Sequence, residues 1–237
     1  MKPRWSAVRI ATAASLAVWA ALFWFLIAAD RLPYYLASRT TWLAPVGALT
    51  LTLAAVGRAL TARTTHDERL TRRNLRNLVI LALPAVVIMG FPPLVLGSYA
   101  VERRSATDKG AYVSRSGRDI STGDLSLQDI FGLSYTGETD KLAARAGSTS
   151  SFTGFVSHNT GGSGDEFQLN RFMVTCCPGD AVSVSLRVVG APPGKFKPDD
   201  WVRVTGRIYP IGKEVVVDAE KVEPVARPEQ PYLSQTR

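Results

Sequence analysis

The chain is poor in residues that bind metals or act as bases: its 237 residues include only two cysteines and two histidines. The cysteines, Cys176 and Cys177, are adjacent, and the histidines are His66 and His158. A structural zinc site made of four cysteines of this chain is therefore excluded. A nucleophile–base triad needs a histidine near an activated side chain, and no serine elbow motif accompanies His158. We expect no catalytic residues and no enzymatic activity.

Acidic residues are scarce in the first part of the chain, and this scarcity locates the net charge of +8. Residues 1–99 contain 11 Lys and Arg but only three acids, whereas residues 100–237 contain 17 of each sign. The second part is neutral and has no net attraction for a phosphate backbone. Its aromatic residues are spread along the predicted strands, so we expect them to fill the core instead of stacking on bases. They are Phe155, Phe172, Trp201 and Tyr209. We therefore predict no nucleic-acid partner.

Charge is absent from three long apolar runs near the N-terminus. The runs cover residues 10–29, 40–57 and 77–98. Each has about the 20 residues that a helix needs to cross a bilayer. Pro84 should kink the third run, and Pro92-Pro93 should end it. The sequence predicts a membrane domain at residues 1–99 with three transmembrane helices, and hence the lipid bilayer as a partner.

Basic residues flank the three runs unevenly. The N-terminus carries Lys2, Arg4 and Arg9, and the segment between the second and third runs carries six arginines. A cleaved signal peptide is the alternative for the first run, but the run exceeds the roughly 7–15 apolar residues of a signal. The positive-inside rule makes the N-terminus and the arginine-rich segment cytoplasmic. Three crossings then place the C-terminal domain outside the cytoplasm, in a multi-pass protein of the cell membrane.

The sequence after residue 99 changes from polar to alternating. Residues 100–124 predict a linker, and residues 125–150 predict a short helical lead-in. Residues 151–237 alternate apolar and polar side chains as half-buried strands do. Five strands are predicted, at residues 152–158, 167–175, 182–188, 201–209 and 214–225. Little helix among them favours a closed OB-like five-stranded β-barrel, with a β-sandwich fragment as the alternative. Gly154 and Gly206 lie inside strands, where a small barrel bends sharply.

The adjacent cysteines lie where a Pro-Gly pair ends the second predicted strand. Neighbouring residues of a regular strand point to opposite faces, but a turn here can bring both thiols to one side. Three readings are open. Cys176 and Cys177 are structural thiols, or they bind a metal ion, zinc being the candidate, together with Asp180. His158 and Asp165 are further candidate ligands. In the third reading the cysteines form a strained vicinal disulfide that senses redox state.

Several strings of the sequence resemble those of a bacterial membrane-protein family. They are Pro92-Pro93-Leu94, Leu96-Gly97-Ser98, Thr153-Gly154-Phe155-Val156, Arg171-Phe172, Thr175-Cys176-Cys177, Asp180-Ala181, Asp200-Trp201-Val202 with Val204 and Gly206, and Pro231-Tyr232-Leu233. With its hydrophobic N-terminal runs, most of the chain resembles the YcgQ-like family. The chain departs from that family at Pro178-Gly179, where the family has Ala-Ala or Val-Ala.

The resemblance implies the small subunit of a two-component membrane permease complex, encoded beside the permease, and a link to metal-ion handling with zinc as the favoured ion. The first functional hypothesis is thus an accessory membrane subunit whose outer barrel binds or gates beside a membrane permease. No ionisable residue lies inside the three runs to form an ion path of its own, which favours this role. The alternative is a stand-alone extracytoplasmic protein that binds metal or senses redox state.

Overall fold

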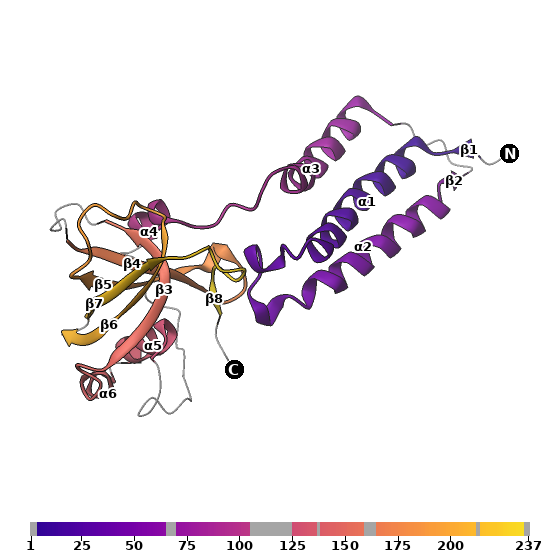
Figure 1. Cartoon of the computed structure of the whole chain (residues 1–237). Coiled ribbons are helices and arrows are strands. Elements are labelled where there is room, and N and C mark those ends of the chain that lie inside the picture. The colour runs from indigo at the N-terminus through magenta and orange to yellow at the C-terminus, as the bar shows by residue number, and fades with distance from the viewer. Residues whose placement is uncertain are drawn as a thin grey trace. The chain divides into compact units, whose positions relative to one another are not determined.

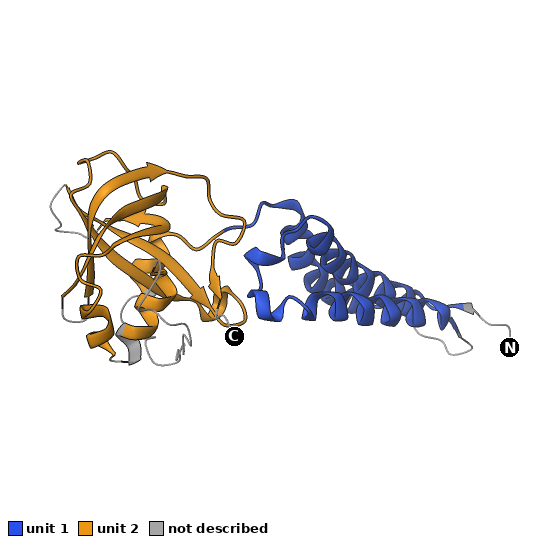
Figure 2. Ribbon diagram, turned by 60° about the horizontal axis from the view of Figure 1, so that its bottom comes forward, with its two compact units in different colours: residues 1–94 blue, residues 95–237 orange. Residues whose placement is uncertain are grey.

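The computed structural model describes residues 4–64, 70–104, 125–136, 138–158, 165–211 and 214–234. The chain divides into two compact units (Figure 2). Unit 1 is Met1–Leu94, and unit 2 is Val95–Arg237. Most of the predicted linker and the loop at residues 159–164 lie outside the described residues.

Unit 1 contains three long helices (Figure 1). They are α1 (Ala7–Ala28), α2 (Leu43–Leu60) and α3 (Arg72–Gly90), and short 3₁₀ turns at Leu32–Tyr34 and Ser38–Thr40 connect α1 to α2. All three are long and apolar enough to cross a membrane, the second when it is counted from Ser38. The prediction of three membrane-spanning helices is confirmed to this extent.

Helix α1 is the central helix of unit 1, since it packs against both α2 and α3. Ala44 and Ala48 of α2 and Ala85 of α3 are fully buried. Leu22 and Leu26 of α1 form one apolar cluster with Ala85. Small side chains let helices approach closely. In lipid the hydrophobic effect does not hold helices together, so this close packing stabilises the helix contacts instead.

Helix α3 continues through Pro84 and ends at Gly90, just before the Pro92-Pro93 pair. Proline cannot donate a backbone hydrogen bond, so the helix is weakened around Pro84. On the same stretch, the indole N–H of Trp19 in α1 donates to the carbonyl of Leu81 at 3.1 Å. This bond ties α1 to α3 within one turn of Pro84.

The N-terminus and the chain after α2 meet at one end of unit 1. The two-residue strands β1 (Arg4–Trp5) and β2 (Arg63–Thr64) pair there in antiparallel fashion. The guanidinium of Arg9 donates to the carbonyl of Thr61 at 2.7 Å, and Arg58 Nε donates to Thr12 Oγ1 at 3.1 Å. These basic residues therefore connect the N-terminal end of α1 to the C-terminal end of α2.

Unit 2 is a closed five-stranded β-barrel, which confirms the predicted fold class. Its strands are β3 (Thr149–Ser157), β4 (Phe167–Val174), β5 (Val182–Val189), β6 (Trp201–Ile211) and β7 (Glu214–Pro224). The order is β3-β6-β7-β5-β4, and β4 pairs with β3 to close the ring. Only β5 and β7 pair in parallel among these five, as in an OB-like Greek-key barrel. A two-residue strand, β8 (Leu233–Ser234), adds to the edge of β4.

The barrel core follows from the alternation of the strands. Inward positions are fully buried, as in Leu169, Leu186 and Val204. Gly154 is needed because a Cβ there would lie 2.6 Å from the carbonyl oxygen of Asn170. At Gly206, beside a register irregularity in the β6–β7 pairing, a Cβ would collide with the carbonyl of Asp218. Both glycines thus permit the close strand approach that was expected of a small barrel.

Two short helices extend this core. They are α5 (Leu127–Thr136) and α6 (Thr139–Ala143). Their Leu127, Ile130 and Leu142 belong to the same buried cluster as the barrel strands. Ser126 Oγ accepts the N–H of Asp129 at 3.2 Å, and Asp129 Oδ2 accepts the N–H of Ser126 at 3.0 Å. This reciprocal pair is a capping box that starts α5.

A second apolar layer lies outside the barrel wall. Phe155 stacks on Phe172, with ring centroids 5.8 Å apart, and Phe155 is also 5.8 Å from Trp201. Phe155 and Phe172 are buried, but the strand alternation turns them away from the core-facing side. The expectation that all four aromatic residues fill the core holds for Phe155 and Phe172 only as burial, since they lie outside the barrel core cluster. Trp201 is half-buried, and the expectation is wrong for Tyr209, which is 38% exposed.

The segment predicted as a linker begins with helix α4 (Ser98–Arg104). Asp199 Oδ1 accepts the N–H of Ser98 at 2.5 Å, and the hydroxyl of Tyr232 accepts the N–H of Leu96 at 3.2 Å. Val101 of α4 is 5% exposed. These contacts attach residues 95–104 to unit 2, and they could not be read from a polar composition.

Candidate metal centre

The cysteine pair lies in the short connection from β4 to β5. Strand β4 ends at Val174, and Pro178–Asp180 form a single 3₁₀ turn. The N–H of Asp180 donates to the carbonyl of Cys177 at 3.1 Å, which closes the turn. Pro178 suits the start of such a turn because it has no N–H to satisfy. The pleat of the strand is therefore interrupted before Cys176, so its alternation no longer forces the two thiols apart.

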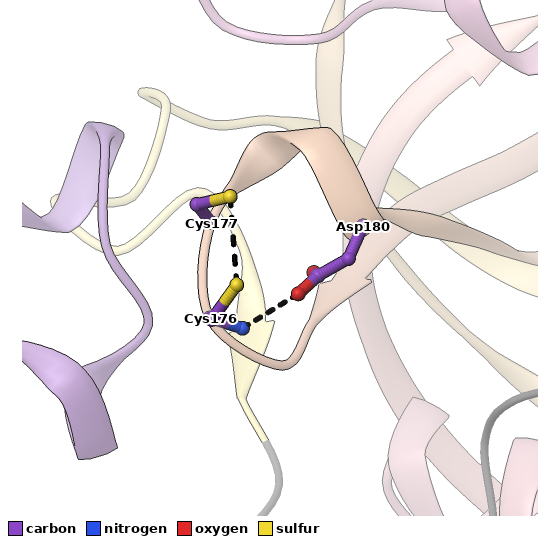
Figure 3. A group of neighbouring side chains, drawn as sticks. All are labelled: Cys176, Cys177 and Asp180. Atoms are coloured by element: carbon purple, nitrogen blue, oxygen red, sulfur yellow. Dashed lines mark hydrogen bonds between the residues drawn. The ribbon is translucent and has the colours of Figure 1, made fainter.

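Asp180 holds this connection together (Figure 3). Its Oδ1 accepts the backbone N–H of Thr175 at 2.9 Å, and its Oδ2 accepts the backbone N–H of Cys176 at 2.8 Å. Side chains of Asp commonly bond the backbone a few residues away in this manner. These two hydrogen bonds fix the carboxylate beside the two sulfur atoms.

Cys176, Cys177 and Asp180 form what we call the thiol–carboxylate group. One ligand atom from each residue lies within 4.8 Å of the other two, so the group can hold a metal ion. The two Sγ atoms are 3.5 Å apart, and no disulfide joins the two cysteines. Cys176 is exposed, and Cys177 and Asp180 are half-buried. Figure 3 shows both sulfur atoms and the carboxylate on the inner side of the turn.

The electrostatics of the group favour protonated cysteine in the absence of a cation. Hydrogen bonds of the Cys176 thiol to Asp180 and Cys177 raise the pKa of Cys176 to about 12. Burial alone would raise the pKa of Asp180. Hydrogen bonds from the Cys176 thiol and from backbone N–H groups outweigh that effect and lower it. A metal cation reverses this balance, because it displaces the thiol proton on binding.

A disulfide between these cysteines is disfavoured by backbone geometry. The Cα atoms of adjacent residues joined by a trans peptide are about 3.8 Å apart. Unstrained disulfides have Cα atoms roughly 4.4–6.8 Å apart. The peptide between Cys176 and Cys177 is trans, and Cys177 is extended at φ −159° and ψ 167°. Of the readings left open by the sequence, a metal site or a pair of structural thiols fits this backbone better than a vicinal disulfide.

The remaining candidate ligands lie outside the thiol–carboxylate group. The Nε2 atom of His158 is 3.1 Å from the carbonyl oxygen of Phe196. The imidazole of His158 therefore contacts the connection between β5 and β6. Asp165 sits beside the start of β4, and its carbonyl oxygen accepts the N–H of Ala191 at 3.3 Å. Among the described residues, the structure brings together three of the four proposed metal ligands and leaves His158 elsewhere.

Sequence reasoning did not identify the backbone N–H groups of Thr175 and Cys176 as parts of the site. They orient the Asp180 carboxylate, and they contribute no side-chain chemistry that a motif search would find. The available signal was an aspartate at the end of a Pro-Gly turn, a position from which Asp often bonds its own backbone.

Fold and site together define the class of this protein. It combines three helices suited to crossing a membrane with a closed five-stranded barrel that displays a thiol–carboxylate group. Residues 135–235 match the model of the DUF1980 C-terminal domain, a domain of an uncharacterised family. The match begins in α5, ends just after β8 and includes the whole site. No curated protein matches the chain.

Proposed function

We propose that the protein is an integral membrane accessory subunit of a permease complex, whose extracytoplasmic barrel binds zinc at the thiol–carboxylate group. The observation that carries this proposal is a three-donor group on the surface of a barrel attached to membrane-spanning helices. Thiolate sulfur and carboxylate oxygen are both common zinc ligands, so the residues fit the ion. The role is one of binding and presentation; it requires no catalysis by this chain.

The arrangement of unit 1 supports the proposed orientation. The N-terminus and the basic segment after α2 lie at the same end of the helices, joined by the β1–β2 pair. Basic residues concentrate on the cytoplasmic side of membrane proteins, so we assign this end to the cytoplasm. Three crossings then bring unit 2 out on the opposite side of the membrane.

The surface of unit 1 supports a partner within the membrane. The uncharged parts of the three helices, residues 10–28, 43–57 and 77–90, contain no Asp, Glu, Lys, Arg or His. Such helices offer no ion path of their own, since intramembrane ion pathways use polar and ionisable side chains. A largely apolar groove is available for a partner helix, and it is lined by Trp19, Asn77, Leu81 and Pro84. The amide of Asn77 is exposed there. A helix of the permease that carries a polar side chain suits this groove.

The proposal is tested by metal analysis of the full chain purified in detergent. We expect one zinc ion per chain in the native protein and none in a Cys176→Ser/Cys177→Ser double variant. Glu220→Gln, which alters only an exposed ion pair with Arg207, should retain the ion. A native protein without bound zinc after loading and desalting would contradict the metal-binding role.

Orientation is tested with a membrane-impermeant maleimide, because Cys176 and Cys177 are the only thiols of the chain. Labelling of intact cells is expected. Labelling that occurs only in inverted vesicles would place the barrel in the cytoplasm and contradict the proposal. The partnership is tested by purification from cells that express the neighbouring permease, which should co-purify at a fixed ratio.

A second candidate function is a stand-alone metal-binding membrane protein. The thiol–carboxylate group favours it, because all three donors come from one chain and need no partner to assemble. This candidate predicts the same zinc content as the first but no co-purifying permease. The two experiments above therefore separate the candidates.

A further inference from the structure

We infer that the thiol–carboxylate group is an exchange site for a tetrahedral, thiophilic divalent cation: the ion is cargo held by three donors of this chain, and its fourth position is open to a donor from outside. This inference rests on the proposed metal binding and specifies the ion class and the way in which the ion is held. Three independent observations support it.

The first observation is that hydrogen bonds between the loop's own groups hold its conformation. The Asp180 carboxylate accepts two backbone N–H bonds, from Thr175 and Cys176. The turn is closed by the bond from Asp180 N–H to Cys177 O, and Ala181 beyond it is 3% exposed. Structural zinc ions supply folding free energy to chains that lack such order. An ion bound here is not needed to fold the loop, so the protein can release the ion without unfolding.

The second observation is the number and exposure of the donors. Closed structural zinc sites use four protein ligands, whereas sites with an open position use three. The described residues bring three donors together, and the one with the most solvent contact is Cys176. His158, which the sequence suggested as a further ligand, has its Nε2 atom 3.1 Å from the carbonyl oxygen of Phe196 instead. Because Cys176 is exposed, an imidazole, thiol or water from outside the chain can reach an ion held by these three donors.

The third observation is the separation of the sulfur atoms, which selects the class of ion. Two metal–sulfur bonds of about 2.3 Å at a tetrahedral angle place the sulfurs about 3.8 Å apart, whereas a linear arrangement needs about 4.6 Å. The observed Sγ–Sγ distance is 3.5 Å. It fits a tetrahedral ion such as Zn²⁺ after a small adjustment. A linear two-coordinate ion such as Cu(I) requires the sulfurs to separate by a further ångström.

The experiment uses Co²⁺ as a visible probe, bound to the full chain in detergent. We expect one Co²⁺ per chain with thiolate charge-transfer bands and the intense visible bands of tetrahedral cobalt. Added imidazole should shift the visible bands, because its nitrogen enters the open position. An excess of a chromophoric chelator should remove the ion within the time needed to mix the two solutions. The unfolding temperature of the metal-free protein should match that of the Cys176→Ser/Cys177→Ser variant, since the loop needs no ion.

Matched variants define which result overturns the inference. Asp180→Asn should weaken Co²⁺ binding by about 10- to 100-fold, the range seen when groups that hold a metal site are altered. His158→Gln should leave the spectrum unchanged. A spectrum that ignores imidazole, an ion retained for hours against the chelator, or loss of tetrahedral bands in His158→Gln would each show a closed four-ligand site. Absence of Co²⁺ from the native protein would instead overturn the proposed metal binding itself.

Discussion

The two units differ in where they place leucine: leucine side chains are exposed on the helices of unit 1 and buried in the barrel of unit 2. In unit 1, Leu53 of α2 is 63% exposed and Leu83 of α3 is 56% exposed. In unit 2, Leu169 and Leu186 are 0% and 1% exposed. Water drives apolar side chains inward in the barrel, but lipid offers no such drive, so helices in a bilayer keep leucines outward and bury alanines. Burial of leucine therefore stabilises the barrel of unit 2, whereas close packing of small side chains stabilises the helices of unit 1.

The largest expected effect tests this contrast with one substitution made in each unit. Leu186→Ala should lower the free energy of unfolding of the barrel by about 2–5 kcal/mol, because it leaves a cavity in a closed core. Leu53→Ala, at an exposed position, should leave barrel unfolding unchanged. Denaturant titration followed by circular dichroism of the β-sheet measures both. A comparable loss in the two variants would remove the distinction between the units.

A second pair of variants compares glycines. Gly154→Ala should destabilise the barrel by about 1–3 kcal/mol, the cost of overpacking, since its new Cβ would meet the Asn170 carbonyl. Gly57→Ala in α2 meets nothing within 4 Å and should be tolerated. Unfolding temperature in detergent reports both changes. Unaltered stability in Gly154→Ala would mean that β3 and β4 can separate without cost.

A third prediction concerns the loop that carries the site. Asp180→Asn should destabilise metal-free barrel by about 1 kcal/mol, because an amide cannot accept both backbone N–H bonds and the group is only half-buried. The pKa of Asp180 is lowered in the folded state, so its ionised form stabilises the fold above its ordinary value of 3.8. That contribution is lost as the pH falls through the lowered pKa.

Unfolding titrations at neutral pH and in acid, well below the ordinary Asp value of 3.8, check this sign. Native protein and Asp180→Asn should differ at neutral pH and converge in acid. A difference that grows in acid would contradict the assigned direction of the shift.

The smallest expected effect lies in unit 1. Trp19→Phe removes the indole donor to the Leu81 carbonyl and should weaken helix packing by about 0.6 kcal/mol, an average for such bonds in membranes. Trp42→Phe, at a side chain that is 61% exposed, is the matched control. Unfolding of unit 1 in mixed micelles of increasing denaturing detergent compares them. Equal midpoints would show that the bond makes no net contribution.

Much of the architecture was predictable because it depends on local patterns. Uncharged runs of membrane-spanning length are read residue by residue, and α3 ends beside Pro92-Pro93 as proline chemistry requires. The alternation of Val182, Val184, Leu186 and Val188 predicted β5 almost to its ends. Gly154 and Gly206 were assigned to sharp bends of a small barrel, and the structure shows that each allows a close approach of a neighbouring strand.

The site was only partly predictable. Cys176, Cys177 and Asp180 are close in sequence, so a turn among them was enough to suggest a group. The hydrogen-bond partner of His158 depended on the path of the β5–β6 connection, which brings the carbonyl of Phe196 to the imidazole of His158. Likewise, nothing local indicated that Asp199 and Tyr232 would hold residues 96–98, which are far away in the chain.

By itself, the sequence determined which segments suit lipid, which segments form strands and where the thiols lie along the chain. These properties follow from hydropathy, period and turn chemistry, and each of them acts over a few neighbouring residues. Only the tertiary structure decided that the sulfurs lie 3.5 Å apart beside a carboxylate fixed by backbone N–H groups. It also decided that Phe155 and Phe172 pack outside the barrel wall. The physical reason is that side-chain distances and directions depend on how strands and connections pack together, and packing depends on the whole chain.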